Sequence, residues 1–579
     1  MPGPSPAAPP AAAASQFARR DLWIALGFLL IALLLQYGDA LRMPFLGDDY
    51  SILDKTRDAS FVSLWGRNQL LYYWWRPWSR ELHYWALQRG AGLAVVPWHL
   101  ASFSLWLGVM GLYLALGRRL IGLPAAAVAA AAVAALASWG GTLLWVAGVQ
   151  ELWMLVWALL ALLLFARRQS GLSAVALALA LLSKETAGVV GGIALVWALA
   201  VDRDRPAAAA RRIAPLAAVT LLWLLVHPWI LPRLRGVPMD AAEAGTRPAP
   251  AIAALRAGLA LVNLEQVPAP ATSWGEALRT GLPGILALVL MTIWALRRAR
   301  RDPTPAAPGA FAVALTWGVL GTLPLLLPAI GWHAYYGLLG ALGVWLLIAP
   351  VLTRIPALGV AVVLALAVLR PLRADTPSWD WSSKAYFQRA GFFIEALRSD
   401  LLKRHPTVPP HSRLYFSQVP RNIGLVVGDG PAFRVWYHDP TLHAGFYSTY
   451  APRFASAPPG RDFFFKFDST LTWREVVEGP EDVGRARSAD PEWEEDHREL
   501  ALVLGSAGDW DHAAGEMIKL QQAFPDRVAY AVNLAFVYAR LQDTTQALAW
   551  YRRAAAMPNA SASVREAAAE FENRLQPRR

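Results

Sequence analysis

The stretch that decides the fold is "DLWIALGFLLIALLLQYG", Asp21 to Gly38. A helix needs ~20 mostly apolar residues to cross a bilayer, and this run supplies them. No small-residue cleavage site follows it, and comparable runs recur as far as Pro371, which indicates a retained span rather than a cleaved signal. The sequence therefore predicts an integral membrane protein.

The composition of the whole chain agrees with this prediction. Of its 579 residues, 56% are hydrophobic and 27 are tryptophan, which favours a polytopic membrane protein over a string of soluble domains. By the ~20-residue criterion the chain contains about eleven spans. The expected ranges are 21–38, 97–117, 121–139, 143–166, 172–184, 186–201, 213–231, 281–297, 309–329, 333–350 and 355–371.

The positive charges predict the orientation. The formal charge is +12, but much of the excess lies in short clusters between apolar runs, which does not favour a nucleic-acid partner. The clusters fall in every second loop, as the positive-inside rule requires of cytoplasmic loops. They are Arg19/Arg20, Arg118/Arg119, Arg167/Arg168, Arg203 to Arg212, Arg297 to Arg301 and Arg354. We expect a multi-pass protein of the bacterial cytoplasmic (inner) membrane, with its N-terminus in the cytoplasm and its C-terminal region in the periplasm.

The chain divides by composition into four parts. They are a disordered cytoplasmic tail (1–20), a membrane domain (21–371) with long outer loops at 39–96 and 232–280, a small soluble α/β module (372–489) and helical repeats (490–579). In the α/β module we expect a helix over 385–404 and four short strands. The expected strands are "RLYFSQV" (413–419), "IGLVVGD" (423–429), "AFRVWYHD" (432–439) and "DFFFKFD" (462–468).

Two segments near the C-terminus repeat each other. "GDWDHAAGEMIKLQQAFPD" (508–526) aligns with "QDTTQALAWYRRAAAMPN" (542–559), which places Ala547 34 residues after Ala513. This period, the small residues and the closing prolines resemble tetratricopeptide repeats, which are stacked helical hairpins. A plain helical bundle with accidental spacing is the alternative.

The first outer loop concentrates charged and aromatic residues. "FLGDDYSILDK" (45–55) places Asp48 beside Asp49, and "LYYWWRPWSRELHYWALQ" (71–88) follows. Aromatic residues favour the membrane interface, but Arg76, Arg80 and His83 add groups suited to an anionic phosphate. The plainer readings are that the carboxylates cap a helix or are solvated, and that the arginines anchor the loop to lipid headgroups.

Six motifs, taken together and in the order in which they follow along the chain, resemble those of the polyprenyl-phosphate-dependent membrane glycosyltransferases of the GT-C superfamily. The motifs are "GDDY", "RPWSRELHYW", "PWHLASFSLWLGVMGLYLALGRRL" with His99, "LLWVAGVQELWMLVWALLALLLF", "LLSKETA" and "GWHAYYGLLGAL". Val149 stands where the family usually has arginine, whereas Glu151 keeps the acidic residue. The layout of spans followed by repeats also resembles dolichyl-phosphate-mannose-protein mannosyltransferases and related transmembrane mannosyltransferases that end in tetratricopeptide repeats.

The resemblance implies transfer of a hexose such as mannose, with inversion, from a polyprenyl phosphate or diphosphate donor to a protein or glycan acceptor on the outer face. Asp48 or Asp49 would be the general base. Lys184, Arg76 and Arg80 would bind the donor phosphate. His83, Glu151, His333 and Tyr336 would bind substrate. The expected partners are the lipid-linked donor, membrane lipid, the acceptor and a protein bound through the repeats.

Several alternatives stay open at this point. Lys184 and Glu185 could form an ion pair at a span end, and Asp48, Asp49, Glu151 and Glu185 carry the oxygen ligands that Mg²⁺ or Mn²⁺ accepts, although no tight ligand spacing supports a metal. A membrane-anchored repeat scaffold for a cell-envelope complex is the second functional class, but tethering requires only one span. A transporter is the third, and no inverted repeat supports it.

Overall fold

The computed structural model describes residues 11–67, 74–234, 249–265, 271–301, 303, 305–326, 333–372, 384–420, 423–454, 456–467, 472–476 and 491–575. The chain forms two compact units, Met1–Gly391 and Phe392–Arg579. The domain boundaries expected near residues 371 and 489 stay predictions.

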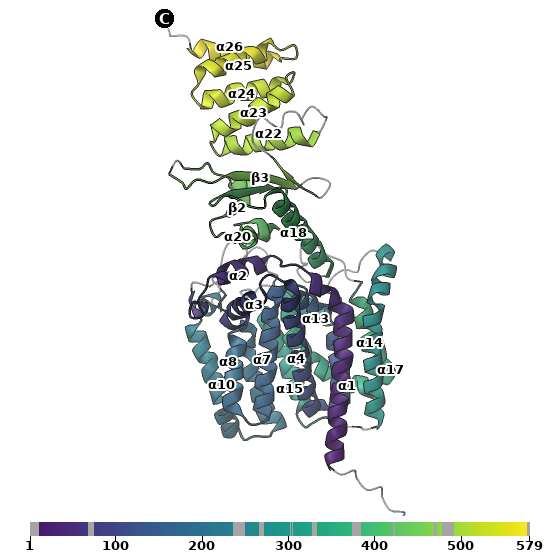
Figure 1. Cartoon of the computed structure of the whole chain (residues 1–579). Helices are drawn as coiled ribbons and strands as arrows, with labels where there is room; N and C mark the ends of the chain where they lie inside the picture. The colour runs from purple at the N-terminus through teal and green to yellow at the C-terminus, as the bar shows by residue number, and fades with distance from the viewer. Residues whose placement is uncertain are drawn as a thin grey trace, which may run out of the picture. The chain divides into compact units, whose positions relative to one another are not determined.

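The first unit is a bundle of helices (Figure 1). Its long helices run side by side, and α2 and α3 lie at one end of the bundle. Its α-helices are α1 (Ala11–Tyr37), α2 (Asp48–Arg57), α3 (His83–Ala91), α4 (Val95–Ile121), α5 (Leu123–Ala134), α6 (Gly140–Leu143), α7 (Val149–Ala166), α8 (Ser170–Leu181), α9 (Val190–Val196), α10 (Pro206–Val226), α11 (Ile230–Leu234), α13 (Pro250–Ala260), α14 (Trp274–Arg301), α15 (Ala310–Thr322), α16 (Leu338–Arg354) and α17 (Pro356–Leu369).

The described helices support a multi-pass membrane protein. Six are long and apolar enough to cross a bilayer, and a seventh crossing results if the pair on either side of a 63° bend at residues 135–136 is one span. Each of the other four expected spans coincides with a shorter apolar helix, namely Ser170–Leu181, Glu185–Val201, Ala310–Leu326 or Pro356–Leu369. The count of eleven crossings therefore stays a prediction.

Asn263 holds the bend between α5 and α6 in place. Its backbone has a φ of 58°, a left-handed conformation that asparagine tolerates better than most residues. Its side chain accepts a hydrogen bond from Ala137 N (2.8 Å) and donates to Ala135 O (2.9 Å) and Leu366 O (2.8 Å). The buried amide thus satisfies backbone groups that the helix break leaves open. Beyond the bend, the chain leads to the start of α7, which carries site residues.

The second unit contains a four-stranded sheet of order β2-β1-β3-β4. β1 (Arg413–Ser417) pairs in parallel with β2 (His443–Phe446) and with β3 (Asp462–Phe467), and β4 (Trp473–Glu475) runs antiparallel to β3. α18 (Lys384–Arg404), which crosses the boundary between the units, confirms the helix expected over 385–404. The expected strands at 413–419 and 462–468 are confirmed by β1 and β3.

The strands expected at 423–429 and 432–439 are wrong. These residues contain the helices α19 (Gly424–Val427) and α20 (Pro431–Tyr437). Pro431 is the first residue of α20, where its fixed φ suits a helix and its missing N–H costs nothing. Local backbone chemistry here outweighs the strand preference of the aromatic and β-branched side chains that follow.

Five helices follow the sheet and stack in chain order (Figure 1). They are α22 (Pro491–Ser506), α23 (Trp510–Ala523), α24 (Val528–Arg540), α25 (Thr544–Ala556) and α26 (Ala562–Leu575). Asp509 and Asp543 cap α23 and α25 in the same way, each accepting a hydrogen bond from the backbone N–H three residues later. The repeated helical hairpin is thus present, while its identification as a tetratricopeptide repeat stays a prediction.

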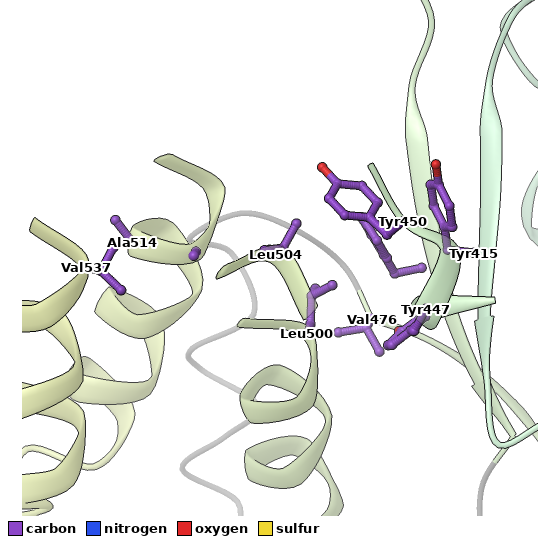
Figure 2. Packing of buried hydrophobic residues seen from close by; sticks show 10 residues of the cluster. Tyr415, Tyr447, Tyr450, Val476, Leu500, Leu504, Ala514 and Val537 are labelled. Carbon is purple, nitrogen blue, oxygen red and sulfur yellow. The ribbon is translucent and has the colours of Figure 1, made fainter. Parts of the chain in front are cut away.

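The sheet and the first helical hairpins share one hydrophobic core (Figure 2). Tyr415, Tyr447, Tyr450, Phe464 and Val476 from the sheet region pack in one cluster with Leu500, Leu504, Ala513, Ala514 and Val537 from the helices. Beside this cluster, the buried Lys466 of β3 pairs with Asp496 (3.2 Å) and Glu499 (2.8 Å) of α22. The sheet therefore covers the first helices of the array, and the second unit is one body.

Candidate functional site

The two adjacent carboxylates have different environments. Asp49 is 0% exposed. Its Oδ2 accepts a hydrogen bond from Leu46 N (2.7 Å), and its Oδ1 accepts from the Tyr84 hydroxyl (2.7 Å) and from Ala147 N (2.7 Å). Asp48, the first residue of α2, is only partly buried. Asp49 therefore ties α2 to α3 and to the start of α7, and Asp48 is the more accessible carboxylate of the pair.

Burial dominates the electrostatics of Asp49. It raises the pKa of Asp49 to about 7, against the three hydrogen bonds, which favour the charged form. Burial and the neighbouring Asp49 also raise the pKa of Tyr84 well above its usual value, so its hydroxyl remains a donor. Because the oxygens of Asp49 already hold three protein donors, this residue is poorly placed to take a proton from a substrate.

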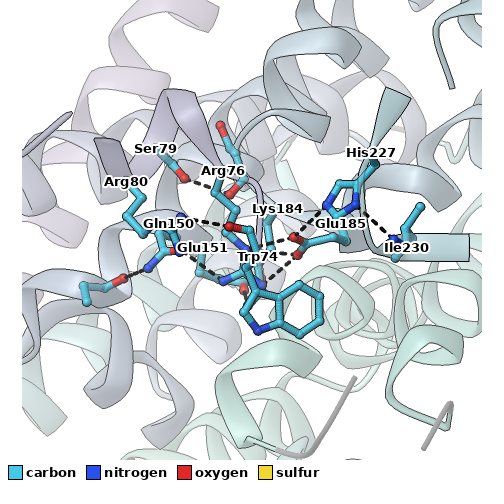
Figure 3. A network of polar contacts seen from close by, with 12 residues as sticks. Trp74, Arg76, Ser79, Arg80, Gln150, Glu151, Lys184, Glu185, His227 and Ile230 are labelled. Carbon is cyan, nitrogen blue, oxygen red and sulfur yellow. Dashed lines mark hydrogen bonds and ion pairs between the residues drawn. The ribbon is translucent and has the colours of Figure 1, made fainter. Parts of the chain in front are cut away.

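Arg76 is the centre of a buried polar network (Figure 3). Its guanidinium donates to both oxygens of Glu185 (Nε to Oε1 3.1 Å, Nη2 to Oε2 2.7 Å) and to Gln150 Oε1 (2.9 Å), and it lies 4.7 Å from the centre of the Trp74 ring. Burial alone would lower the pKa of Arg76, but the Glu185 carboxylate outweighs this and the net shift is upward. Arg76 is therefore a permanent buried cation.

Lys184 supplies a second cation in the same network. It is 2% exposed, and its ammonium forms an ion pair with Glu151, which is buried in the first turn of α7. The ammonium also lies over two aromatic rings, 3.5 Å from the centre of Tyr336 and 5.0 Å from that of Tyr335. Glu185 pairs with Arg76 rather than with its neighbour Lys184, so the adjacent ion pair considered from the sequence is wrong.

His227 supports the opposite side of Glu185. Its Nδ1 accepts hydrogen bonds from the backbone N–H groups of Ile230 (3.0 Å) and Trp229 (3.2 Å). The ring proton must therefore be on Nε2, which lies 3.8 Å from Glu185 Oε1. This neutral histidine directs an N–H group toward the carboxylate that holds Arg76.

Asp49 and the cations are connected by a chain of hydrogen bonds. The backbone N–H of Ala147 donates to Asp49 (2.7 Å), and the backbone carbonyl of the same residue accepts a hydrogen bond from Gln150 Nε2 (2.9 Å). The same Gln150 side chain then accepts from Arg76 through its oxygen (2.9 Å). The backbone of one residue, Ala147, and one side chain, that of Gln150, thus separate the buried Asp49 from the cationic network.

The remaining expected site residues lie at different distances from this network. His333 packs against the rings of Tyr335 and Tyr336, with centroid separations of 5.5 and 5.1 Å, and so belongs to the aromatic group over Lys184. Arg80 is connected to the network through Trp74, whose ring faces Arg76. It donates to Trp74 O (2.8 Å) and to the carboxylate of Glu81 (2.7 Å).

His83 lies apart from the cations. It is buried beside Trp153, whose indole N–H bonds its Nδ1 (3.2 Å). Burial lowers the pKa of His83 to about 4, so this ring carries no positive charge for a phosphate at neutral pH. His99, in the second span, bonds the backbone oxygens of Met43 (3.1 Å) and Leu143 (3.2 Å) and has a structural role.

Sequence reasoning missed the roles of Gln150, His227, Trp74 and Tyr335. The segment "HPW" at 227–229, a polar residue at the end of an apolar run, was an available signal for His227. Gln150 is adjacent to Glu151, which was selected as the acidic residue of the motif. Nothing in the sequence marks Trp74 or Tyr335 out from the many neighbouring aromatic residues.

A divalent cation does not fit the acidic residues as they are arranged. Among the described residues, no group of three or more histidine or acidic side chains is placed to hold a metal ion. Asp49 accepts three hydrogen bonds, Glu151 is paired with Lys184, and Glu185 is paired with Arg76.

Comparisons with known proteins add one weak likeness. No family model matches the sequence, and no curated protein matches it. A solved structure, ArnT from Cupriavidus metallidurans bound to undecaprenyl phosphate, is similar at 14% sequence identity with a TM-score of 0.38, over 79% of this chain and 94% of that one. A likeness of this size carries no argument, so the function has to be inferred from the site and from the ordered motifs.

Proposed function

We propose that this protein is an integral membrane glycosyltransferase of the GT-C type. It transfers a sugar from a polyprenyl phosphate donor to an acceptor on the outer face of the membrane. The observation that carries the proposal is that two buried cations, Arg76 and Lys184, lie in a network that is hydrogen-bonded through Gln150 and the backbone of Ala147 to Asp49, the neighbour of Asp48. Buried ionisable groups beside membrane spans are costly and serve mainly functional sites.

Both cations retain donors for a phosphate. Arg76 has five N–H groups, and its bonds to Glu185 and Gln150 use three of them. Lys184 has three N–H groups, and among the described residues Glu151 accepts one of them. The carboxylates offset the cost of burying the charges in the absence of donor, and the free N–H groups form charge-assisted hydrogen bonds when the phosphate binds.

Asp48 is the proposed general base. As the acceptor hydroxyl attacks the anomeric carbon, its proton passes to Asp48, the new carbon–oxygen bond forms, and the bond to the phosphate oxygen breaks. General-base catalysis of this kind contributes typically 10²–10⁴-fold. The charge that develops on the leaving phosphate is stabilised by Arg76 and Lys184. A single displacement inverts the anomeric configuration.

The second unit fits the same proposal as a protein-binding region. Its stacked helices form a short array, and such arrays bind proteins along their surfaces. We propose that the second unit binds an acceptor protein or an assembly partner.

The test compares glycolipids and glycoproteins by mass spectrometry in a deletion strain carrying wild type, Asp48→Asn or Asp58→Asn. Asp58 is the matched control, because it lies at the end of the same helix with a largely exposed side chain. We expect the deletion to lose a glycan, and wild type and Asp58→Asn to restore it. Asp48→Asn should reach the membrane without restoring it. Restoration by Asp48→Asn contradicts the assignment of the base. No lost glycan, together with a stable protein partner bound by residues 392–579, favours the scaffold instead.

A further inference from the structure

Among the described residues, two buried polar atoms in the segments that carry Lys184 and its counter-ion have no hydrogen-bond partner. Glu151 is 0% exposed, and while its Oε2 pairs with Lys184, its Oε1 receives no hydrogen bond from any described residue. Thr186 is 2% exposed and lies in the short helical turn η7 (Glu185–Val189), two residues after Lys184. Its hydroxyl likewise has no partner among the described residues. Buried polar groups are nearly always hydrogen-bonded, so each atom is a candidate contact for a polar group of a ligand.

The chemistry of the two atoms restricts what that group is. An ionised carboxylate oxygen only accepts hydrogen bonds, whereas a threonine hydroxyl both donates and accepts. A group that bonds both atoms must therefore be a donor, which an ionised phosphate is not. The network holds two cations, Arg76 and Lys184, and two carboxylates, Glu151 and Glu185, so a neutral donor leaves its charge balance unchanged. A hydroxyl group, the commonest group of a sugar, meets both conditions.

The connection through Lys184 indicates which hydroxyl this is. Under the function proposed above, on which this inference rests, the Lys184 ammonium binds the donor phosphate. Glu151 is paired with the same ammonium, so only the Lys184 ammonium separates this carboxylate from the position of the phosphate. The Oε1 atom of the carboxylate, which has no partner among the described residues, therefore lies beside the donor site. In a glycosyl phosphate, the hydroxyl closest to the phosphate is on carbon 2, next to the anomeric carbon.

We propose that Glu151 and Thr186 form a subsite for the hydroxyl on carbon 2 of the transferred sugar. The donor class is then a polyprenyl phosphate sugar with a free 2-hydroxyl group, rather than a 2-deoxy or 2-acetamido sugar. Hydrogen bonds to this hydroxyl strengthen as positive charge develops at the anomeric carbon, so the subsite favours the transition state as well as binding.

Thr186→Val is the informative variant. Valine has nearly the shape of threonine and removes a hydroxyl that bonds no described residue, so the melting temperature should stay the same or rise. Ser183→Ala is the matched control in the same segment. The Ser183 hydroxyl donates to Leu179 O (2.7 Å), so its loss affects the protein and not the proposed ligand.

The experiment measures lipid binding to the purified full chain in nanodiscs. The probes are undecaprenyl phosphate alone and undecaprenyl phosphate carrying glucose, mannose or 2-deoxyglucose. We expect wild type and Ser183→Ala to bind the glucose or the mannose lipid about fivefold to tenfold more tightly than the 2-deoxyglucose lipid, the worth of one hydrogen bond. Thr186→Val should lose part of this preference, because Glu151 still accepts from the 2-hydroxyl group, and should bind undecaprenyl phosphate as wild type does.

The outcomes separate this inference from the function on which it rests. Equal affinity of wild type for 2-hydroxy and 2-deoxy lipids overturns the subsite, as does a full preference retained by Thr186→Val. Loss of bare undecaprenyl phosphate binding in Thr186→Val also overturns it, because the hydroxyl would then serve the phosphate. If wild type binds none of the four lipids, the proposed function itself is refuted.

Discussion

The ion pair between Arg76 and Glu185 allows structure and function to be separated by a double variant. Both side chains are buried, and the guanidinium donates to both oxygens of the carboxylate. Glu185→Gln keeps the size of the side chain but leaves a buried guanidinium without its counter-charge. Breaking a buried pair in this way costs about 3–5 kcal/mol, so this single variant should be strongly destabilised.

The double variant Arg76→Gln/Glu185→Gln should regain most of that stability. Two neutral amides can hydrogen-bond each other, and replacing a buried ion pair by neutral groups is often nearly neutral in free energy. We expect the double variant to lie within about 1–2 kcal/mol of wild type, so the stability effects of the two changes should be strongly non-additive. It should nevertheless fail to bind undecaprenyl phosphate, because the phosphate has lost one of its two cations.

The assay combines thermal unfolding of the purified variants, followed by tryptophan fluorescence, with binding of undecaprenyl phosphate in nanodiscs. The single variant Arg76→Gln completes the double-mutant cycle with Glu185→Gln and the double variant. A Glu185→Gln variant as stable as wild type would refute the structural part of the reasoning. A well-folded double variant that binds the lipid as wild type does would show that the pair is only a structural brace.

Three further predictions concern stability. The pKa of Asp49 is raised from 3.8 to about 7, so the stability that this residue contributes is present below about pH 4 and is lost as pH rises through 7. Between about pH 4 and pH 7, the melting temperature of wild type should therefore fall more than that of Asp49→Asn. Asn263→Ala removes the described partner of the Ala137 N–H and of the Ala135 carbonyl, so it should cost about 1–3 kcal/mol for a buried unpaired group, measured by thermal unfolding. Residues 490–579 alone expose the side of α22 that the sheet covers, so they should melt lower and aggregate more than residues 392–579 in scanning calorimetry.

Much of the fold follows from local patterns in the sequence. The apolar run at 21–38 lies within a long helix, and the 34-residue spacing corresponds to two identically capped helices. The segment at 432–439 was misread, because aromatic and β-branched residues resemble a strand while Pro431 starts a helix. The number of crossings was beyond local reasoning, since helices shorter than the bilayer thickness depend on their neighbours to span it.

The site was predictable in its residue types but not in its pairings. Arg76 and Glu185 are 109 positions apart, and Lys184 and Glu151 are 33 apart, so only the packing of the helices decides which charges meet. The sequence presents Asp48 and Asp49 as equivalent neighbours. Their difference arises because Asp49 is fully buried and accepts hydrogen bonds from Leu46, Tyr84 and Ala147, whereas Asp48 is only partly buried.

The measurement that tests the central claim most directly follows a labelled sugar out of its lipid donor. Membranes from the deletion strain, supplied with wild type or Asp48→Asn, are incubated with undecaprenyl phosphate carrying radiolabelled glucose or mannose. We predict that wild type moves label from the lipid fraction into an acceptor and releases undecaprenyl phosphate, and that Asp48→Asn does neither. Label that stays on the lipid with both proteins, or leaves it equally with both, would contradict the account.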